Sequence, residues 1–205
     1  MLRRRTVGIG ALIVFVVATI AWAANTAMST KSPASSGMHR ASAAANDRFA
    51  YLSSQHTNFC TLAAHTVLGY RDDQRMQGSC CNPMDRDKYR AQIRALRQYA
   101  GIPEIPTDPY DIQAGQAKRL LGYDTSITFA GHDKITFDAA MKMTDDKGPC
   151  CCQCWRWYMT EGLDKFLITR RHMPANEVAT ITDLVNGCGG PPDRSANQGT
   201  APPKT

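Results

Sequence analysis

Four of the eight cysteines in this chain stand within five consecutive positions, at Cys150, Cys151, Cys152 and Cys154. The other four, Cys60, Cys80, Cys81 and Cys188, lie before and after this group. Thiolates bind soft metal ions such as Cu(I) and Zn(II), exchange with disulfides in redox enzymes, or are used up in structural disulfides. The sequence therefore offers three kinds of function: a metal site, a thiol–disulfide enzyme and a disulfide-stabilised domain.

The crowded segment GPCCCQCWRW, residues 148–157, is expected at the start of a helix over residues 151–171. A helix N-terminus carries a partial positive charge and free backbone N–H groups, and both stabilise thiolates. Cys151 and Cys154 also have the C-x-x-C spacing, which places both thiols on one side of a helical turn. This placement suits a metal site and a redox pair equally well.

Two further groups of residues can add ligands. His56 and Cys60 are four positions apart in a predicted helical stripe over residues 49–63, so they share a helix face, as two ligands of one metal ion must. Cys80 and Cys81 lie together in a predicted turn. These residues are expected to join the crowded cysteines only if the fold brings the segments together.

The last cysteine follows the last predicted helix. Gly187 is expected to end that helix with a left-handed backbone, which would fix the direction of Cys188. An antiparallel pairing of the last two helices would return Cys188 to the crowded segment. Met84, His172 and Met173 are further soft donors, but methionine fills gaps in a core more often than it binds metal.

Backbone geometry limits the disulfide alternative. Adjacent cysteines have Cα atoms about 3.8 Å apart, which is shorter than ordinary disulfides accept. Cys80 and Cys81 are therefore not expected to pair with each other, nor are neighbours within 150–152. Four bridges between the crowded group and the outlying cysteines would use every thiol. An even count in an exported protein favours such bridges, whereas the crowding of thiols favours a soft metal.

Residues 1–24 have the layout of a secretory signal peptide, with three arginines, an apolar run over 7–24 and a small-residue cleavage pattern at 21–23. The run is also long enough to remain as a signal anchor in a membrane. The paired arginines would also suit twin-arginine export. Each alternative places the remainder of the chain outside the cytoplasm.

Composition divides the remainder into three parts. Residues 25–45 are small and polar without apolar periodicity, which predicts a disordered tether, and residues 191–205 are expected to form a disordered tail. Residues 46–190 are expected to form one cysteine-rich helical domain. A domain of this size buries about 70% of its unfolded surface, so eight cysteines need a reason beyond stability.

The domain is predicted to be all-α, a small irregular helical bundle. Apolar residues recur at helical spacing over residues 85–100, 112–121, 134–144 and 151–171, and in a fifth helix around 178–185. Asp85 is expected to cap the first of these helices, and Gly101 and Gly122 to end the first and second. Alternating patterns typical of strands do not extend beyond a few residues.

Charge and motifs exclude several functions. The formal net charge is +6, and removal of the signal arginines leaves about +3, with both signs interspersed. This is a solvated surface and not a nucleic-acid footprint. The sequence also lacks C-x-x-C-H, G-x-S-x-G, H-E-x-x-H and phosphate-binding glycine loops.

The residues Pro149-Cys150-Cys151-Cys152-Gln153-Cys154 resemble the P-C-Y-C-G-C signature of PCYCGC-motif-containing bacterial lipoproteins. The proline and the alternate cysteines match. Cys151 stands where that family has tyrosine, Gln153 stands where it has glycine, and no cysteine follows the apolar N-terminal run for lipid attachment. The resemblance implies an exported, cysteine-rich protein and no particular activity.

Our leading hypothesis is an exported protein that binds a soft metal ion, Cu(I) or Zn(II), for sequestration or handover. The expected ligands are Cys150, Cys151, Cys152, Cys154, Cys188, Cys60, Cys80, Cys81 and His56. Trp155 is expected in the core, and Trp157 is expected to shield the cysteines or contact a partner. The alternatives are a disulfide-stapled interaction domain and an oxidoreductase that uses Cys151 and Cys154, although no thioredoxin-like βαβ pattern accompanies that pair.

Overall fold

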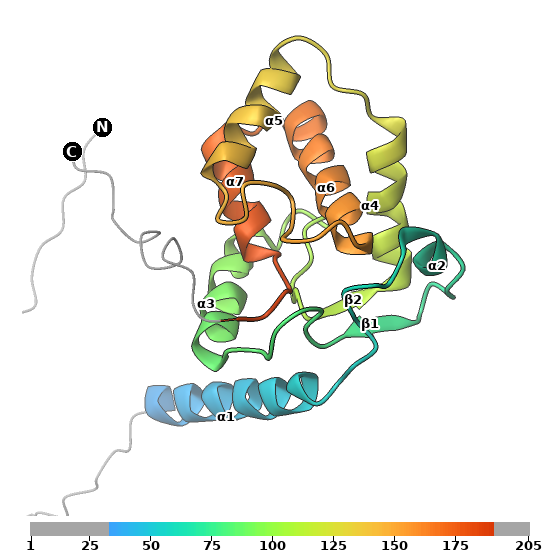
Figure 1. Ribbon diagram of the computed structural model, residues 1–205. Helices are drawn as coiled ribbons and strands as arrows, with labels where there is room; N and C mark the ends of the chain where they lie inside the picture. The colour runs from blue at the N-terminus through green and yellow to red at the C-terminus, as the bar shows by residue number, and fades with distance from the viewer. Residues whose placement is uncertain (1–32, 191–205) are drawn as a thin grey trace, which may run out of the picture.

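Helices dominate the computed structural model, which describes residues 33–190, with side chains from residue 43 onward (Figure 1). The helices are α1 (Pro33–Ser53), α2 (Ala64–Leu68), α3 (Arg86–Leu96), the 3-10 turn η1 (Arg97–Tyr99), α4 (Ala114–Ser126), α5 (His132–Met143), α6 (Trp155–Arg171) and α7 (Ala175–Leu184). Strands β1 (Arg75–Gln77) and β2 (Asp111–Gln113) pair antiparallel. The prediction of a mainly helical fold is confirmed. The small sheet was not predicted because strands of three residues are too short to show alternation.

Helix α6 forms the centre of the core. The predicted apolar stripe consists of Trp155, Met159, Leu163, Phe166 and Leu167. Phe166 is half-buried and the other four are fully buried, and each fully buried side chain contributes about 1.5–3 kcal/mol by leaving water. The stripe belongs to one apolar cluster with buried residues of α4, α5 and α7. This packing holds the start of α6, where the crowded cysteines lie, in a fixed position.

The helix boundaries follow the predicted caps only in part. The carboxylate of Asp85 accepts hydrogen bonds from the backbone N–H groups of Asp87 and Lys88, so this predicted cap is confirmed. The helical segment ends with η1 just before Gly101, as predicted, but the left-handed stop is wrong because Gly101 does not have a positive φ. The stop at Gly122 is also wrong, since α4 continues through it to Ser126. Tertiary packing on α6 keeps that last turn helical, and Tyr123 stacks there on Phe166.

Helix α1 includes the second half of the segment for which the composition predicts a disordered tether. Alanine is the best helix former, and this part of the chain is rich in it. At the end of α1, Leu52 packs with Tyr89 and Tyr110, and Arg48 forms an ion pair with Asp111. These contacts involve residues within the predicted domain of 46–190, so the boundary at residue 46 stays a prediction.

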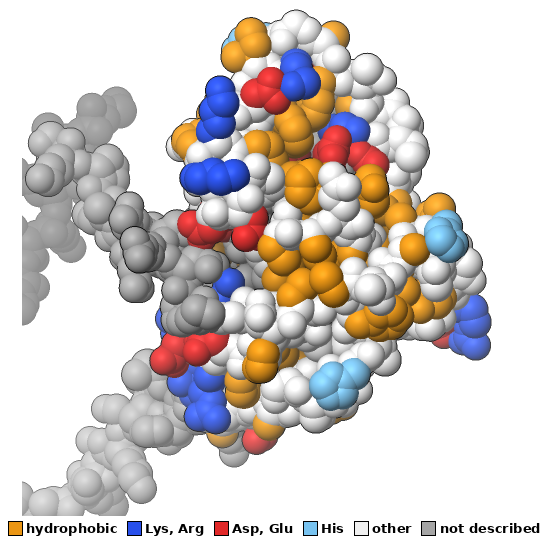
Figure 2. Space-filling model, in the orientation of Figure 1, with side chains coloured by type: hydrophobic (Ala, Val, Ile, Leu, Met, Phe, Trp, Pro, Cys, Tyr) orange, Lys and Arg blue, Asp and Glu red, His pale blue; other side chains and the backbone are white. Residues whose placement is uncertain are grey.

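Two predicted segments lie outside the described residues: the signal peptide or anchor over 1–24 and the tail over 191–205. Among the described helices, none combines the length and the apolar character needed to cross a membrane. Figure 2 shows hydrophobic side chains, a class that includes cysteine in its colouring, gathered near the start of α6, with charged side chains around them.

One buried acid lies within the helical core. Asp164 on α6 is fully buried, and its burial raises the pKa of its carboxyl well above the usual value. The hydroxyl oxygen of Thr182 lies 2.8 Å from both Asp164 Oδ1 and the carbonyl oxygen of Val178. A hydroxyl has only one proton to donate, so a protonated Asp164 that donates to Thr182 satisfies both contacts.

This acid should make the domain less stable as the pH rises. Above the usual pKa of 3.8, the unfolded chain has lost the Asp164 proton while the folded chain retains it, so the free energy of unfolding falls with increasing pH. Urea unfolding of the reduced protein between about pH 4.5 and 8 measures the slope. Asp164→Asn should remove the contribution of this acid to the slope of unfolding free energy against pH. Asp138→Asn on the exposed face of α5 should leave that slope unchanged. Parallel curves for wild type and Asp164→Asn would contradict the assignment.

Candidate metal-binding site

All eight cysteines lie in one cluster built from four segments. Cys60 comes from the loop between α1 and α2, and Cys80 and Cys81 from the turn after β1. The crowded group over 150–154 is the loop that leads into α6, and Cys188 follows α7. The predicted return of Cys188 to the crowded segment is thereby confirmed.

Backbone hydrogen bonds fix the outlying cysteines to one another. The N–H of Cys80 donates to the carbonyl of Gly187 over 3.2 Å, and the N–H of Asn82 donates to the carbonyl of Cys188 over 2.9 Å. The N–H of Trp155 donates to the carbonyl of Leu62 over 3.0 Å, which ties the loop of Cys60 to the start of α6. The thiols are therefore held by paired backbone and not by loose loop ends.

A buried asparagine joins three of these segments. Asn58 is 2% exposed, accepts a hydrogen bond from Trp155 Nε1 over 3.0 Å and donates one to the carbonyl of Gly78 over 3.0 Å. Its side chain thus connects the loop of Cys60 with the start of α6 and with the turn after β1. Sequence reasoning did not find Asn58, because a single polar residue in a loop gives no signal before its partners are known.

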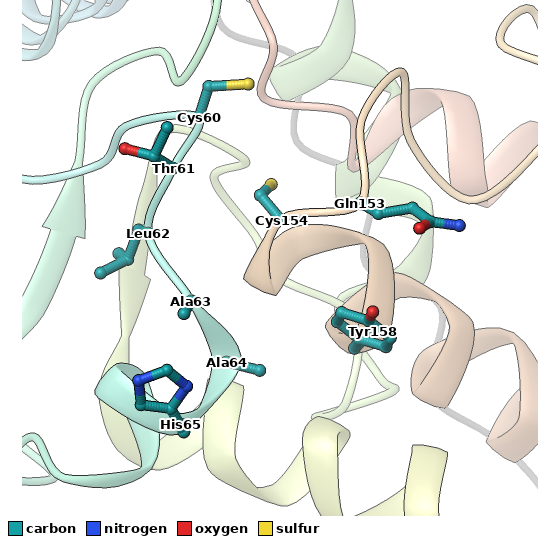
Figure 3. Close-up of a pocket in the computed structure, with 9 residues that line it drawn as sticks. All are labelled: Cys60, Thr61, Leu62, Ala63, Ala64, His65, Gln153, Cys154 and Tyr158. Atoms are coloured by element: carbon teal, nitrogen blue, oxygen red, sulfur yellow. The ribbon is translucent and has the colours of Figure 1, made fainter.

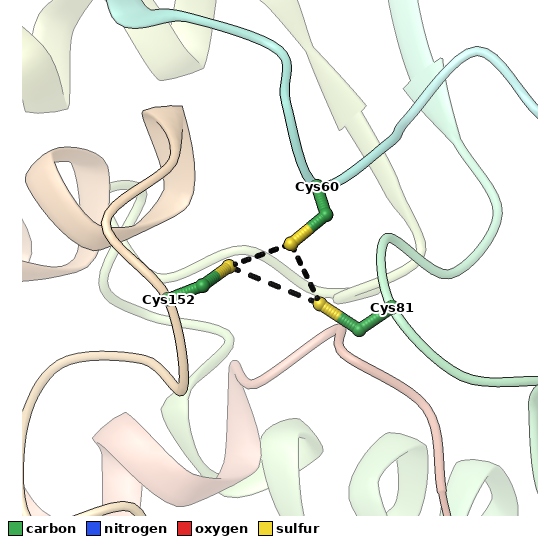
Figure 4. A group of neighbouring side chains, drawn as sticks. All are labelled: Cys60, Cys81 and Cys152. Atoms are coloured by element: carbon green, nitrogen blue, oxygen red, sulfur yellow. Dashed lines mark hydrogen bonds between the residues drawn. The ribbon is translucent and has the colours of Figure 1, made fainter.

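The outer part of the cluster is a triangle of thiols from three segments. The Sγ atoms of Cys60 and Cys152 are 3.0 Å apart, those of Cys60 and Cys81 are 3.3 Å apart, and those of Cys81 and Cys152 are 3.8 Å apart. Figure 4 shows the three side chains pointing toward one another. Cys81 is exposed and the other two are half-buried, so this triangle faces solvent.

The inner part of the cluster centres on Cys188. Its Sγ atom lies 3.2 Å from those of Cys150 and Cys151 and 3.4 Å from that of Cys80. Cys80, Cys150 and Cys188 are between 4 and 8% exposed, and Trp157 packs against them, as expected for a shielding residue. The inner part is therefore largely dry.

The sulfur separations fit a soft metal ion. Within the described part of the chain, three sets of three thiols have all their sulfurs within 4.8 Å of one another: Cys60, Cys81 and Cys152; Cys80, Cys81 and Cys188; and Cys150, Cys151 and Cys152. A Zn–S bond of about 2.3 Å places tetrahedral ligand sulfurs about 3.8 Å apart. The closest pairs, 3.0–3.4 Å apart, would widen by about 0.4–0.8 Å to admit such an ion and would close by about 1.0–1.4 Å to form a disulfide of about 2.05 Å.

One thiolate is stabilised within the cluster. Hydrogen bonds from the Cys150 and Cys80 thiols lower the pKa of Cys154 to about 2, and the backbone N–H of Arg156 adds to this effect. The same hydrogen bond to Cys154 raises the pKa of Cys150 to about 12 and also raises that of Cys80. The predicted stabilisation of a thiolate at the start of α6 therefore applies to Cys154, which is the N-cap residue.

Three further thiols, those of Cys81, Cys152 and Cys188, hold their protons more strongly than free cysteine because their pKa values are raised. Burial raises the pKa values of Cys81 and Cys152, and the hydrogen bond with Cys150 raises that of Cys188. A metal ion bound here must displace these protons, because the thiolate is the form that coordinates metal.

A buried cation lies beside the inner thiols. Arg156 is 1% exposed, donates from Nη2 to the carbonyl of Pro109, and places its guanidinium 5.1 Å from the Trp155 ring centroid. Its Nε and Nη1 atoms have no hydrogen-bond partner among the described residues. The hydrogen bond with Cys154 raises the pKa of Cys80, and the positive charge of Arg156 opposes that rise. The cation therefore favours negative charge on the Cys80 sulfur.

Gly187 provides the space for this cation. A Cβ atom at this position would lie 2.5 Å from the guanidinium carbon of Arg156 and 2.5 Å from the carbonyl oxygen of Pro109. The expected left-handed backbone at Gly187 is wrong, since the positive φ angles in this segment belong to Gly189 and Gly190. Glycine is therefore needed at 187 for close approach and not for a helix stop.

A hollow of about 330 Å³ opens beside the cluster (Figure 3). Cys60 and His65 lie on one wall, and Gln153, Cys154 and Tyr158 lie on the other. The hollow gives a small ligand room to approach the sulfurs from the side of α2.

Some predicted residues do not join the thiols. Helix α1 ends at Ser53, so His56 and Cys60 do not share a helix face, and the prediction of a two-ligand half-site is wrong in that respect. His56 is exposed and lines a second hollow together with Cys80, Cys81 and Met84. His172 and Met173 line a hollow at the far end of α6.

The C-x-x-C pair is also arranged differently from the prediction. Residues 150–153 lie in the loop before α6, so Cys151 and Cys154 do not share a helical turn. The Sγ atom of Cys151 lies 3.2 Å from that of Cys188 and 3.7 Å from that of Cys81, while Cys154 hydrogen-bonds with Cys150 and Cys80. The two thiols therefore have different neighbours.

Comparisons with protein-family models, curated proteins and solved structures find no match to this chain. The function is therefore argued from the geometry of the thiols, the buried arginine and the hollow beside them.

Proposed function

We propose that this protein binds a soft metal ion, Cu(I) or Zn(II), through its cysteine cluster and stores it or hands it over. The observation that carries the proposal is the convergence of eight thiols from four segments into one branched set, in which Cys81 lies near Cys60, Cys80, Cys151 and Cys152. Soft ions prefer sulfur ligands, and thiols that converge from several segments can surround one ion. Export of the chain is part of the proposal, supported by the signal-like layout of residues 1–24.

Several observations favour metal binding over an oxidoreductase. The stabilised thiolate of Cys154 is 5% exposed, whereas a reactive thiolate must be reached by a substrate disulfide. A C-x-x-C enzyme also needs its two thiols to face each other, and Cys151 and Cys154 have separate sulfur neighbours. The cluster is therefore better suited to binding a metal ion than to cycling one disulfide between its oxidised and reduced forms.

A second candidate is the fully bridged form of the same cluster. Pairing Cys60 with Cys152, Cys81 with Cys151, Cys150 with Cys188, and Cys80 with Cys154 uses every thiol once and joins no adjacent residues. Each pair connects two of the four segments. An oxidising compartment would favour this form, in which the protein is a disulfide-stabilised domain and binds no metal.

The test begins with the mature domain, reduced and kept without oxygen. Native mass spectrometry after titration with Cu(I) or Zn(II) should show stoichiometric uptake, and the double variant Cys152→Ser/Cys154→Ser should lose it because it removes ligands from both parts of the cluster. The matched control is His172→Ala/Met173→Leu, which alters soft donors far from the cluster. Unchanged uptake by the cysteine variant would remove these thiols from the site.

Alkylation of the protein as exported separates the two candidates. Bound metal together with eight alkylatable thiols after unfolding supports the metal site. The bridged form instead gives no alkylation without reductant and a mass lower by two hydrogens for each bridge.

A further inference from the structure

We propose that the cluster contains two linked metal sites of unequal exchange rate. The inner site, where the thiolates of Cys150 and Cys188 with Sγ atoms 3.2 Å apart can hold Cu(I) beside Cys80 and Cys154, retains its ion. The outer site, formed by Cys60, Cys81 and Cys152, releases its ion first. This inference rests on the proposed metal-binding function and adds which thiols act in handover.

Burial distinguishes the two sites. The inner cysteines are 8% exposed or less, and the Trp157 side chain packs over three of them. The outer triangle contains the exposed Cys81 and two half-buried thiols. A competing ligand must reach an ion to remove it, and the apolar surroundings of a metal site control that access. Exchange should therefore begin at the outer triangle.

Electrostatic interactions also favour retention of the ion at the inner site. A Cu(I) ion bound by two thiolates carries a net charge of about −1, and burial of such an anion is costly unless a cation lies near it. Arg156 is buried beside the inner thiols with Nε and Nη1 unpartnered, so it can balance this charge. The outer triangle faces solvent, where water and salt screen the charge. The inner ion is therefore held by an interaction that the outer ion lacks.

Two sulfur contacts connect the sites. Cys81 in the outer triangle lies 3.5 Å from Cys80 and 3.7 Å from Cys151, and Cys151 lies 3.2 Å from Cys188 (all Sγ to Sγ). These separations allow an ion to pass between sites by exchanging one thiolate at a time. The hollow has Cys60 of the outer site on one wall and Cys154 of the inner site on the other, so an incoming ligand meets a thiol of each site there.

The experiment loads the reduced, oxygen-free protein with Cu(I) to saturation and mixes it with an excess of a Cu(I) chelator that absorbs light when it binds the ion. We expect two release phases that differ in rate about tenfold or more, a difference of the size that surroundings produce at metal sites. Cys60→Ser should remove the fast phase and leave the slow rate unchanged. Cys150→Ser should remove the slow phase, and circular dichroism verifies that both variants fold.

A second measurement uses the wild-type protein alone. Alkylation of the Cu(I)-loaded protein with N-ethylmaleimide, followed by peptide mapping, should label Cys60, Cys81 and Cys152 before the inner thiols. A single release phase together with uniform labelling would overturn the two-site inference and leave the proposed function standing. A reduced protein that takes up no Cu(I) at all would instead refute the proposed function.

Discussion

Replacing Arg156 by methionine should weaken Cu(I) binding about 10–100-fold, the usual cost of losing a partner outside the ligand shell. The guanidinium is buried beside the inner thiols, and no carboxylate pairs with it in an ion pair among the described residues. The anionic metal–thiolate complex is the partner that would neutralise it. Methionine keeps much of the side-chain volume but removes the charge. Without metal, the variant should unfold no more readily than wild type, because an unpaired buried charge is costly to keep.

Competition with a chelator of known Cu(I) affinity measures the change. The control is Arg94→Met on α3, which removes an arginine from an exposed position and should leave the affinity unchanged. Arg156→Lys keeps the charge and should recover part of the lost affinity, which a purely space-filling role would not produce. Equal affinities for wild type and Arg156→Met would show that Arg156 does not balance the charge of the bound ion.

Gly162→Ala should destabilise the folded domain by about 1–3 kcal/mol, the range for overfilling a packed interior. Gly162 lies where α6 crosses α4. A Cβ atom there would overlap the carbonyl oxygen of Leu120 and would lie 2.8 Å from the backbone nitrogen of Asp124. Both obstacles are backbone atoms of a helix and cannot rotate away. The two helices would have to separate, which would disturb the packing of the Trp155 stripe.

The matched control is the same substitution in the partner helix. Gly122 lies inside α4, and a Cβ atom there would meet nothing within 4 Å. Alanine favours a helix over glycine by about 1 kcal/mol, so Gly122→Ala should stabilise the domain slightly. Urea unfolding of the reduced, metal-free proteins compares the two variants. A shift of both midpoints in the same direction would contradict the close crossing at Gly162.

Periodicity predicted the elements that carry the core. The apolar spacing of α6 and the Asp85 cap of α3 are local properties, and both are found as expected. The failures occur where tertiary contacts override local preference. Gly122 continues a helix because that helix packs on α6. The three-residue strands depend on pairing with a partner 36 positions away, so no window of sequence contains their cause.

The meeting of the eight cysteines was predicted, but their arrangement was not, and the predicted ligand His56 shares only a hollow with two of them. Cysteine chemistry and the expected return of Cys188 indicated which thiols would meet. The division into a buried and an exposed part depends on hydrogen bonds between distant loops, such as those of Asn58. Arg156 was overlooked because an arginine in a helix is normally solvated, and only the absence of a side chain at Gly187 lets it lie buried.

Under the proposed function, the joining of four segments at the sulfurs couples metal occupancy to folding. A peptide limited to GPCCCQCWRW contains four thiols, but it lacks Cys60, Cys81 and Cys188, which complete both parts of the cluster. Every kilocalorie of binding energy is then also stability of the loops that carry those thiols. A destabilising substitution at a helix crossing far from any sulfur would therefore lower the affinity for the ion. An excess of metal would in turn restore the folded state of such a variant.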